Sequence, residues 1–267
     1  MKTNIVIGDP IEHSLSPVIH AAAYMAHGIS DEYVFKAERV IPAELESVTK
    51  RMRDGDIHAL AVTIPHKQSI ISLLDDVDDV AEQIGAVNTV INRDGALVGY
   101  NTDWQGVLDA LDEITDVKGK KVAILGTGGS AHAVAYAMKQ AGAEMTIFGR
   151  DNHKVIAISK QFGAMPASIE ARSEIASHDV IINATSVGLS PETEVDLLPS
   201  LLLDGDHVVF DLVYPNQTKL LQSAQQAGAK TISGLEMLLH QAVPQIELMT
   251  GLVPDISVMR EAVEDKS

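Results

Sequence analysis

The sequence contains no cysteine, few aromatic residues and few basic residues. The absence of cysteine excludes a disulfide scaffold and any Cys-ligated metal site. Aromatic residues make up 4 % of the 267 residues, so Ala, Val, Ile and Leu must build the core. Lys and Arg number 20 against 37 Asp and Glu, which gives a net charge of −17. This acidic balance, without a dense run of Lys or Arg, argues against binding to nucleic acid or to an anionic membrane.

The chain also lacks a long apolar run. None approaches the ~20 residues needed to span a bilayer, and residues 1–8 show no apolar core of a signal peptide. By elimination we expect a cytoplasmic protein. The length fits one large domain or two of ordinary size.

Short apolar runs alternate with longer amphipathic stretches along the chain. Strands are predicted over residues 4–8, 33–37, 59–64, 87–92, 96–98, 121–125, 144–148, 180–183, 207–212 and 229–233. Helices are predicted over residues 16–27 (with Ser16 as N-cap), 42–53, 67–74, 77–84, 131–140 and 235–250. Such alternation is typical of an α/β fold with parallel sheets, and a polar stretch at 117–120 indicates a junction between two α/β units.

A glycine-rich turn at residues 126–130 joins a predicted strand to a predicted helix. Gly126 permits a tight turn, and Gly128 lets the backbone approach a pyrophosphate. The N-terminus of the following helix would offer N–H groups to that anion. The strand and helix around the turn favour a dinucleotide site over an ordinary turn.

The choice between NAD and NADP depends on Arg150 and Asp151, which follow the second predicted strand of this unit. Asp151 would bind a ribose 2′-hydroxyl and favour NAD, whereas Arg150 would bind a 2′-phosphate and favour NADP. Arg150 comes first after the strand, so NADP is preferred and NAD stays open. Asp151 can instead cap the helix that follows.

Polar side chains stand at several strand-to-helix junctions of the first 103 residues. Ser14 and Ser16 flank a helix start, Thr63 ends a strand, Lys67 follows it, and Asp103 lies near the predicted junction. Ligands of open α/β folds bind beyond the carboxyl ends of the strands. A polyhydroxylated or carboxylated ligand is therefore favoured, although capping serines and a solvated lysine are common alternatives.

Eight motifs resemble those of the shikimate dehydrogenases and the related quinate/shikimate dehydrogenases. They are GDPIEHSLSPVIH (8–20), VTIPHK (62–67), IGAVNTV (84–90), GYNTDWQG (99–106), GTGGSAHA (126–133), INATSVGL (182–189), DLVY (211–214) and GLEMLLHQA (234–242). The resemblance covers residues 7–251. It implies reversible NADP(H)-dependent reduction of 3-dehydroshikimate to shikimate, in chorismate and aromatic amino acid biosynthesis. It also implies an α/β substrate domain at 1–102 plus 236–267, a Rossmann-like NAD(P)-binding domain at 103–235, and a cleft between them.

The resemblance further implies a role for each matching residue. The catalytic pair is Lys67 and Asp103, which suits a reaction that moves a proton at the substrate oxygen while hydride moves at carbon. Ser14 and Ser16 match the residues that bind the substrate carboxylate in the family. The residues that bind its hydroxyls match Thr63, Asn88 and Gln241, and Tyr214 matches a residue that lines the pocket. The cofactor positions are Gly126, Gly128, Gly129, Ser130, Arg150, Thr185, Val187 and Gly234. No metal is implied, and we expect a monomer or a homodimer.

The sequence departs from the family pattern at a few of these places. Ala61 and Trp104 stand where the family has Asn and Gly, and Asp151 stands where it has Thr. Segment 214–218 is one residue shorter than usual. These departures leave open an NAD-dependent quinate/shikimate or aminoshikimate-type dehydrogenase. A non-catalytic, metabolite-binding regulator is a third hypothesis.

Overall fold

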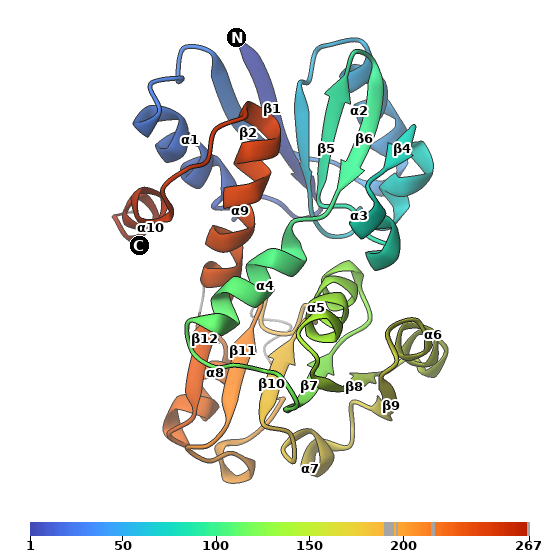
Figure 1. The fold of residues 1–267 in the computed structure, drawn as a ribbon, viewed down its shortest axis with the longest axis vertical. Helices are drawn as coiled ribbons and strands as arrows, with labels where there is room; N and C mark the ends of the chain where they lie inside the picture. The colour runs from blue at the N-terminus through green and yellow to red at the C-terminus, as the bar shows by residue number, and fades with distance from the viewer. Residues whose placement is uncertain (190–194, 196, 215–216, 266–267) are drawn as a thin grey trace. The chain divides into compact units, whose positions relative to one another are not determined.

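The structure, a computed structural model, describes residues 1–189, 195, 197–214 and 217–265. The chain divides into two compact units, Met1–Asp103 with Leu238–Ser267 and Trp104–Met237. In the described residues each unit contains one six-stranded sheet with helices packed on it (Figure 1). The first unit is therefore assembled from both ends of the chain, and the second is continuous.

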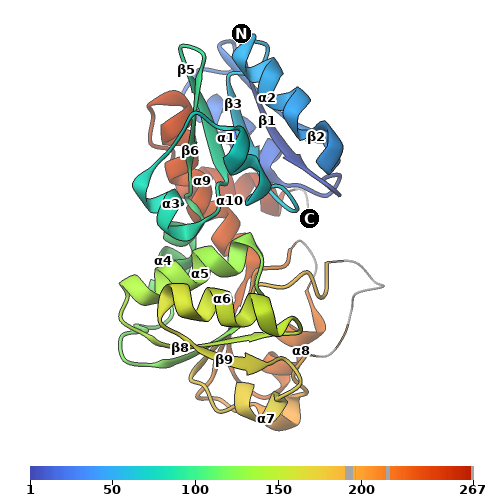
Figure 2. The ribbon, with the colours of Figure 1, turned by 90° about the vertical axis from the view of Figure 1, so that its right-hand side faces the viewer.

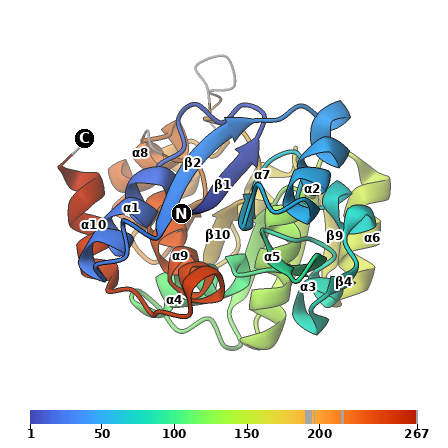
Figure 3. The same cartoon turned by 90° about the horizontal axis from the view of Figure 1, so that it is seen from above.

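The sheet of the first unit has the strand order β2-β1-β3-β5-β6-β4. Its strands are β1 (Lys2–Gly8), β2 (Tyr33–Arg39), β3 (Ala59–Val62), β4 (Asp76–Val77), β5 (Thr89–Arg93) and β6 (Ala96–Tyr100). Its helices are α1 (Ser16–Ala26), η1 (Pro42–Glu44), α2 (Leu45–Arg53), η2 (Ser69–Leu73), α3 (Asp79–Ile84), most of α9 (Gly234–Thr250) and α10 (Ile256–Glu264). Seen from above, α1 and α10 lie side by side (Figure 3).

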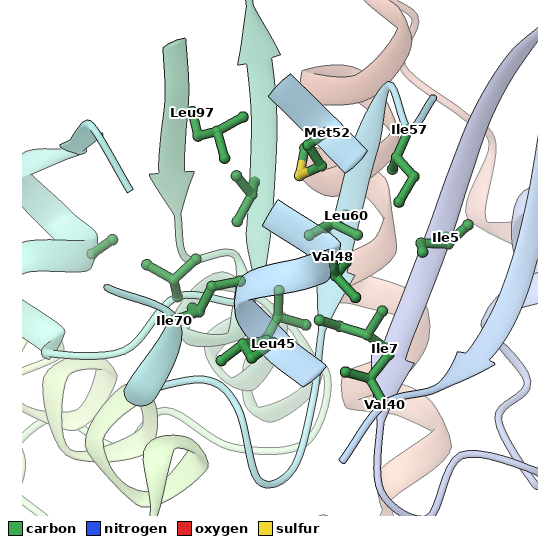
Figure 4. Close-up of a cluster of buried hydrophobic side chains, with 14 residues drawn as sticks. Ile5, Ile7, Val40, Leu45, Val48, Met52, Ile57, Leu60, Ile70 and Leu97 are labelled. Atoms are coloured by element: carbon green, nitrogen blue, oxygen red, sulfur yellow. The ribbon is translucent and has the colours of Figure 1, made fainter. Parts of the chain in front are cut away.

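The alternation of side chains along these strands separates an apolar face from a partly polar one. On one face Ile5, Ile7 and Leu60 pack with Val48 and Met52 of α2, and none is more than 3 % exposed (Figure 4). The intervening positions carry side chains to the other face of the sheet. Asn4 and Thr89 belong to that other face, and their hydrogen-bond partners Tyr24 and Gln245 come from α1 and α9.

The sheet of the second unit is parallel throughout, with the order β12-β11-β10-β7-β8-β9. Its strands are β7 (Lys121–Leu125), β8 (Glu144–Gly149), β9 (Met165–Ser168), β10 (Val180–Asn183), β11 (Val208–Asp211) and β12 (Lys230–Ser233). Its helices are α4 (Asp103–Asp112), α5 (Gly129–Gln140), α6 (Asn152–Phe162), α7 (Arg172–Ile175), η4 (Ser200–Leu202) and α8 (Lys219–Gln226). Helices α5 and α6 pack side by side (Figure 2). The strand order reverses between β7 and β10, which is where doubly wound sheets bind nucleotides.

The predicted α/β class with a Rossmann-like unit is confirmed, but the prediction of parallel sheets is wrong for the first unit. There β5 runs antiparallel to both β3 and β6. The β5–β6 pair is a hairpin, in which the two-residue turn at Asp94 and Gly95, with φ angles of 53° and 93°, reverses the chain as in a type I′ turn. None of the described helices combines the length and apolar composition that crossing a bilayer requires.

Candidate functional site

A buried ion pair joins Lys67 and Asp103 in the first unit. Lys67 Nζ donates to Asp103 Oδ2 at 2.7 Å, and the two side chains are 11 % and 4 % exposed. Lys67 lies in the loop between β3 and η2, and Asp103 is the first residue of α4. Because a buried charge needs a partner, each of these groups holds the other in place.

Two more hydrogen bonds fix the Asp103 residue. Its backbone N–H donates to Asn101 Oδ1 at 2.9 Å, and its Oδ1 accepts from Asn88 Nδ2 at 2.9 Å. The Asn101 amide is itself held by the backbone oxygen of Ala86 at 2.8 Å. Both carboxylate oxygens therefore have a donor, and the lysine is presented in one geometry.

Amide and hydroxyl groups surround the pair. Asn88 Nδ2 also donates to Thr102 Oγ1 at 2.8 Å and lies 3.3 Å from Gln241 Oε1. Gln241 comes from α9, and its own Nε2 donates to the backbone oxygen of Leu238 at 2.8 Å. The site thus combines residues that are 153 positions apart in the sequence. Such neutral donors and acceptors suit the hydroxyl groups of a ligand.

The start of α1 brings Ser14 and Ser16 together, since Ser14 Oγ accepts from the Ser16 backbone N–H at 3.3 Å. The prediction that Ser16 caps the helix is wrong. Leu15 occupies the N-cap, and it makes no side-chain capping bond. Ser16 is instead the first helical residue, so its hydroxyl is not used to cap α1.

Thr63 belongs to the loop that leads to Lys67. Its backbone N–H donates to Ile7 O at 3.0 Å, and its backbone oxygen accepts from His66 N at 2.9 Å. A Cβ on Gly8 would lie 2.6 Å from Thr63 Cγ2. Gly8 therefore permits the close approach of the chain before Ser14 to the chain before Lys67.

His66 is a neighbour of the site that sequence reasoning did not assign to it. It is fully buried, and its Nε2 donates to Val40 O at 2.6 Å. Its Nδ1 makes no hydrogen bond to any described residue. The bond to Val40 ties the loop of Lys67 to the end of β2. The sequence signal that could have identified His66 is its position directly before Lys67, a candidate catalytic residue.

In the second unit the glycine-rich turn connects β7 to α5. Gly126 has φ +116°, and a Cβ there would lie 2.8 Å from Ala184 O, so the position requires glycine. At Gly128 no described atom comes within 4 Å of where a Cβ would be. This open backbone at the N-terminus of a 12-residue helix fits the pyrophosphate of a dinucleotide.

Arg150 and Asp151 have different environments after β8. Arg150 is exposed. Asp151 is the N-cap of α6, and its Oδ1 accepts from the backbone N–H groups of His153 at 3.0 Å and Lys154 at 3.3 Å. The capping prediction for Asp151 is confirmed, so its carboxylate is directed to a helix end rather than to a ribose.

A buried carboxylate connects two further loops of the second unit. Asp211 Oδ1 accepts from Asn183 Nδ2 at 2.8 Å and from Val213 N at 3.1 Å, and Oδ2 accepts from Thr218 Oγ1 at 2.6 Å. Asn183 Oδ1 accepts from Thr185 Oγ1 at 2.6 Å. Burial raises the pKa of Asp211 above its ordinary value, against the opposing effect of these hydrogen bonds.

Asp211 therefore fixes the segments that contain Thr185, Val187 and Tyr214. Val187 N donates to Thr185 Oγ1 at 3.1 Å, which makes this loop compact. Gly234, at the start of α9, closely approaches the chain just after β11, because a Cβ there would overlap Leu212 O. Sequence reasoning missed Asp211 and Asn183 as the groups that hold these loops.

The departures from the family pattern have clear structural settings. Ala61 is buried on β3, directly opposite Thr89 of β5. The Trp104 ring meets the Tyr136 ring edge-on, with centroids 5.5 Å apart. The shorter segment 214–218 includes residues 215 and 216, which lie outside the described residues.

The predicted site residues thus fall into two groups. The first unit contains Ser14, Ser16, Thr63, Lys67, Asn88, Asp103 and Gln241. The second unit contains Gly126, Gly128, Gly129, Ser130, Arg150, Thr185, Val187, Tyr214 and Gly234. Side-chain hydrogen bonds link Lys67, Asp103, Asn88 and Gln241. The roles of all these residues stay predictions.

The sequence matches three family models in succession. Residues 6–90 match the shikimate dehydrogenase substrate binding domain, residues 109–237 match shikimate/quinate 5-dehydrogenase, and residues 234–264 match the shikimate 5′-dehydrogenase C-terminal domain. Together the three models span most of the chain, including both units.

Known proteins resemble the chain over nearly its whole length. Shikimate dehydrogenase (NADP(+)) of Pyrococcus abyssi is 39 % identical over 263 residues, which cover 97 % of this chain and 96 % of that protein. The crystal structure of shikimate dehydrogenase from Aquifex aeolicus has a TM-score of 0.92 at 38 % identity, covering 98 % and 97 % of the two chains. The shikimate 5-dehydrogenase of Thermus thermophilus in complex with NADP(H) and shikimate has a TM-score of 0.88 at 35 % identity, covering 99 % of each chain.

Proposed function

We propose that this chain, which belongs to the shikimate dehydrogenase family, catalyses the reversible NADP(H)-dependent reduction of 3-dehydroshikimate to shikimate. The observation that carries the proposal is the buried Lys67–Asp103 pair beside an amide and hydroxyl cluster. Relatives of this sequence are named for NADP+ and shikimate, and one solved relative is in complex with both. The chemistry of the two groups of residues agrees with those ligands.

In the first unit we assign the substrate to the polar groups around the ion pair. The hydroxyls of Ser14 and Ser16 bind its carboxylate, and Thr63, Asn88 and Gln241 bind its hydroxyls. The substrate needs such donors because the net charge of −17 opposes an anion unless hydrogen bonds are aimed at it.

Lys67 supplies the proton that reduction requires at the substrate oxygen, and it takes that proton back in the reverse direction. Asp103 holds Nζ at 2.7 Å and compensates its positive charge. General acid–base assistance of this kind contributes roughly 10²–10⁴-fold to the rate. Water is largely kept from the two groups, since both side chains are buried.

In the second unit we assign the cofactor to the groups at the strand ends. When bound, NADPH supplies the hydride. The backbone at Gly126, Gly128, Gly129 and Ser130 would hold its pyrophosphate, and Arg150 its 2′-phosphate. Thr185 and Val187 would lie near its nicotinamide ribose, and Gly234 would be a further contact with the cofactor.

The test is an assay of the purified protein with shikimate or quinate and with NADP+ or NAD+, followed by the absorbance of the reduced nicotinamide. We expect the highest kcat/KM for shikimate with NADP+. A preference for quinate with NAD+ would replace this function by that of the alternative paralogue. Nucleotide binding without turnover of any pair would indicate a regulator.

Substitution of the lysine tests the mechanism. Lys67→Ala should lower kcat by roughly 10²–10⁴-fold while NADPH binding, measured by nicotinamide fluorescence, stays unchanged. Lys50→Ala is the matched control, because Lys50 pairs with Asp54 at the exposed surface of α2. Wild-type kcat in Lys67→Ala would remove Lys67 from the mechanism.

We also propose that the protein is cytoplasmic and is a monomer or a homodimer. Cell fractionation would test its location, and sedimentation would test its oligomeric state.

A further inference from the structure

A continuous line of buried hydrogen bonds leads from Asp103 into the core of the first unit. Starting from Asp103, the bonded side chains are, in order, Asn88, Thr89, Gln245, His20, Tyr24 and Asn4. The distances between consecutive side chains in this order are 2.9, 2.9, 2.7, 3.2, 3.3 and 2.8 Å. None of these residues is more than 3 % exposed. We call these seven residues the buried line. It belongs to β1, α1, β5, α9, α4 and the chain just before β5, all within one unit.

The donors and acceptors of the buried line give it one direction. The Asp103 carboxylate only accepts, so the Asn88 amide must turn its NH₂ group toward Asp103. Asn88 Oδ1 then accepts from the backbone N–H of Thr102 at 2.9 Å and from the Thr89 hydroxyl at 2.9 Å. Thr89 has a single proton to donate, and it goes to Asn88 because Gln245 Nε2 donates to the Thr89 oxygen at 2.7 Å.

The same argument extends to His20. With its NH₂ on Thr89, Gln245 turns Oε1 toward His20 Nε2, which must donate. His20 Nδ1 is then an acceptor and faces the Tyr24 hydroxyl. The imidazole stacks on the Phe35 ring, with centroids 3.7 Å apart, and burial lowers its pKa to about 3. It is therefore neutral at ordinary pH, which is the state that this pattern requires.

On the β3 side of the sheet no side chain competes for the Thr89 hydroxyl. Ala61, its partner on β3, shares its face of the sheet and carries no polar side chain that could compete for the hydroxyl. Gln245 is doubly fixed, because its Nε2 also lies 3.3 Å from the backbone oxygen of Asn88.

We propose that Thr89 and Gln245 are positioning residues that hold the Asn88 amide in the orientation needed by Asp103. This inference rests on the proposed function, since it concerns the Lys67–Asp103 pair of that reaction. If the amide turned over, its oxygen would face the Asp103 carboxylate and repel it. Neither residue touches the ion pair, so both act through Asn88.

The experiment compares Thr89→Val, Thr89→Ser, Gln245→Met and the Thr89→Val/Gln245→Met double variant. The control is Thr49→Val, because Thr49 is similarly buried in the same unit and donates to the Glu46 backbone oxygen, away from the buried line. For the oxidation of shikimate we expect Thr89→Val and Gln245→Met each to lower kcat by about 10-fold. The KM for NADP+ should not change, and Thr89→Ser should recover most of the activity.

The double variant should lose about as much activity as either single one, because the two residues act in one line of bonds. The proposal would be overturned if the double variant lost the product of the two single losses in kcat. It would also be overturned if Thr89→Ser were as impaired as Thr89→Val, or if Thr89→Val kept the wild-type kcat. A similar loss in Thr49→Val would also overturn it. If the wild type is active and only these expectations fail, the proposed function stands.

A second measurement needs no substrate. The ¹⁵N chemical shifts of His20 report which ring nitrogen carries the proton. We expect protonation at Nε2 in the wild type. Protonation at Nδ1 would overturn the direction of the buried line even if the enzyme acts on a different substrate.

Discussion

His20 should make the stability of the protein depend on pH in a defined window. Burial lowers the pKa of His20 from 6.5 to about 3 in the folded state. The unfolded chain binds this proton near the ordinary value. As pH falls through the window between the two values, the unfolded state takes up a proton that the folded state refuses. The free energy of unfolding therefore decreases, by at most ~1.4 kcal/mol per pH unit.

The magnitude follows from those two pKa values. The stabilisation is fully present above the unfolded pKa and is lost toward the folded pKa. Between pH 8 and pH 5 the loss assigned to His20 is about 2 kcal/mol. That is a large part of the ~5–15 kcal/mol by which native proteins are stable.

Urea unfolding of the wild type and His20→Gln at pH 8, 7, 6 and 5 measures this effect. The glutamine cannot titrate, so the gap in unfolding free energy between wild type and variant should narrow by about 2 kcal/mol on going from pH 8 to pH 5. His13→Gln is the control, because His13 is exposed, and its curve should follow the wild type. Parallel curves for wild type and His20→Gln would refute the reasoning.

Three further predictions concern the site. Gly126→Ala places a methyl group at a φ of +116°, 2.8 Å from Ala184 O. Urea unfolding should therefore show that the free energy of unfolding falls by roughly 1–3 kcal/mol. An unchanged unfolding midpoint would contradict this argument. Arg150→Ala should raise the KM for NADP+ by about 10-fold and leave that for NAD+ nearly unchanged, since only NADP+ carries the 2′-phosphate. Equal effects on both cofactors would remove Arg150 from that role. Asp103→Asn removes the negative charge beside Lys67 and should lower kcat/KM by roughly 10²–10⁴-fold, and a wild-type value would rule it out as a partner.

The regular elements of the second unit follow closely from its sequence. The predicted strand 121–125 agrees with β7 (Lys121–Leu125), and the predicted strand 180–183 agrees with β10 (Val180–Asn183). Continuous apolar runs bounded by polar residues and glycine define such buried parallel strands well. Strand β9 (Met165–Ser168) was not predicted, because it is mostly exposed at a sheet edge and has no apolar run.

The first unit was harder to predict, since its pairing depends on distant parts of the chain. Residues Asn92–Gly95 close the hairpin between β5 and β6, but no local pattern showed that β5 would also pair with β3 and make the sheet mixed. Helix α10 (Ile256–Glu264) was missed. Residues 67–74 were predicted as a helix, but only a 3-10 turn forms at Ser69–Leu73.

Within the site, the motifs pointed to the residues that carry polar chemistry at strand ends. Thr89 and His20 lie within two of the motifs, but the sequence assigned no role to them or to Gln245, because their hydrogen bonds join residues up to 225 positions apart. A lone histidine or glutamine on a helix face is usually a core residue with a partner. Only the three-dimensional pairing shows which partner it has.

The discontinuity of the first unit has a consequence for the order in which the protein matures. During synthesis the ribosome releases residues 1–103 first, but Gln241 and Gln245, which complete the polar face of their sheet, follow only after the whole second unit. The second unit is continuous and can close its parallel sheet as soon as it has emerged. The unit that is begun first is therefore finished last, and until α9 arrives Asn88 lacks its contact with Gln241 and Thr89 lacks the hydrogen bond from Gln245.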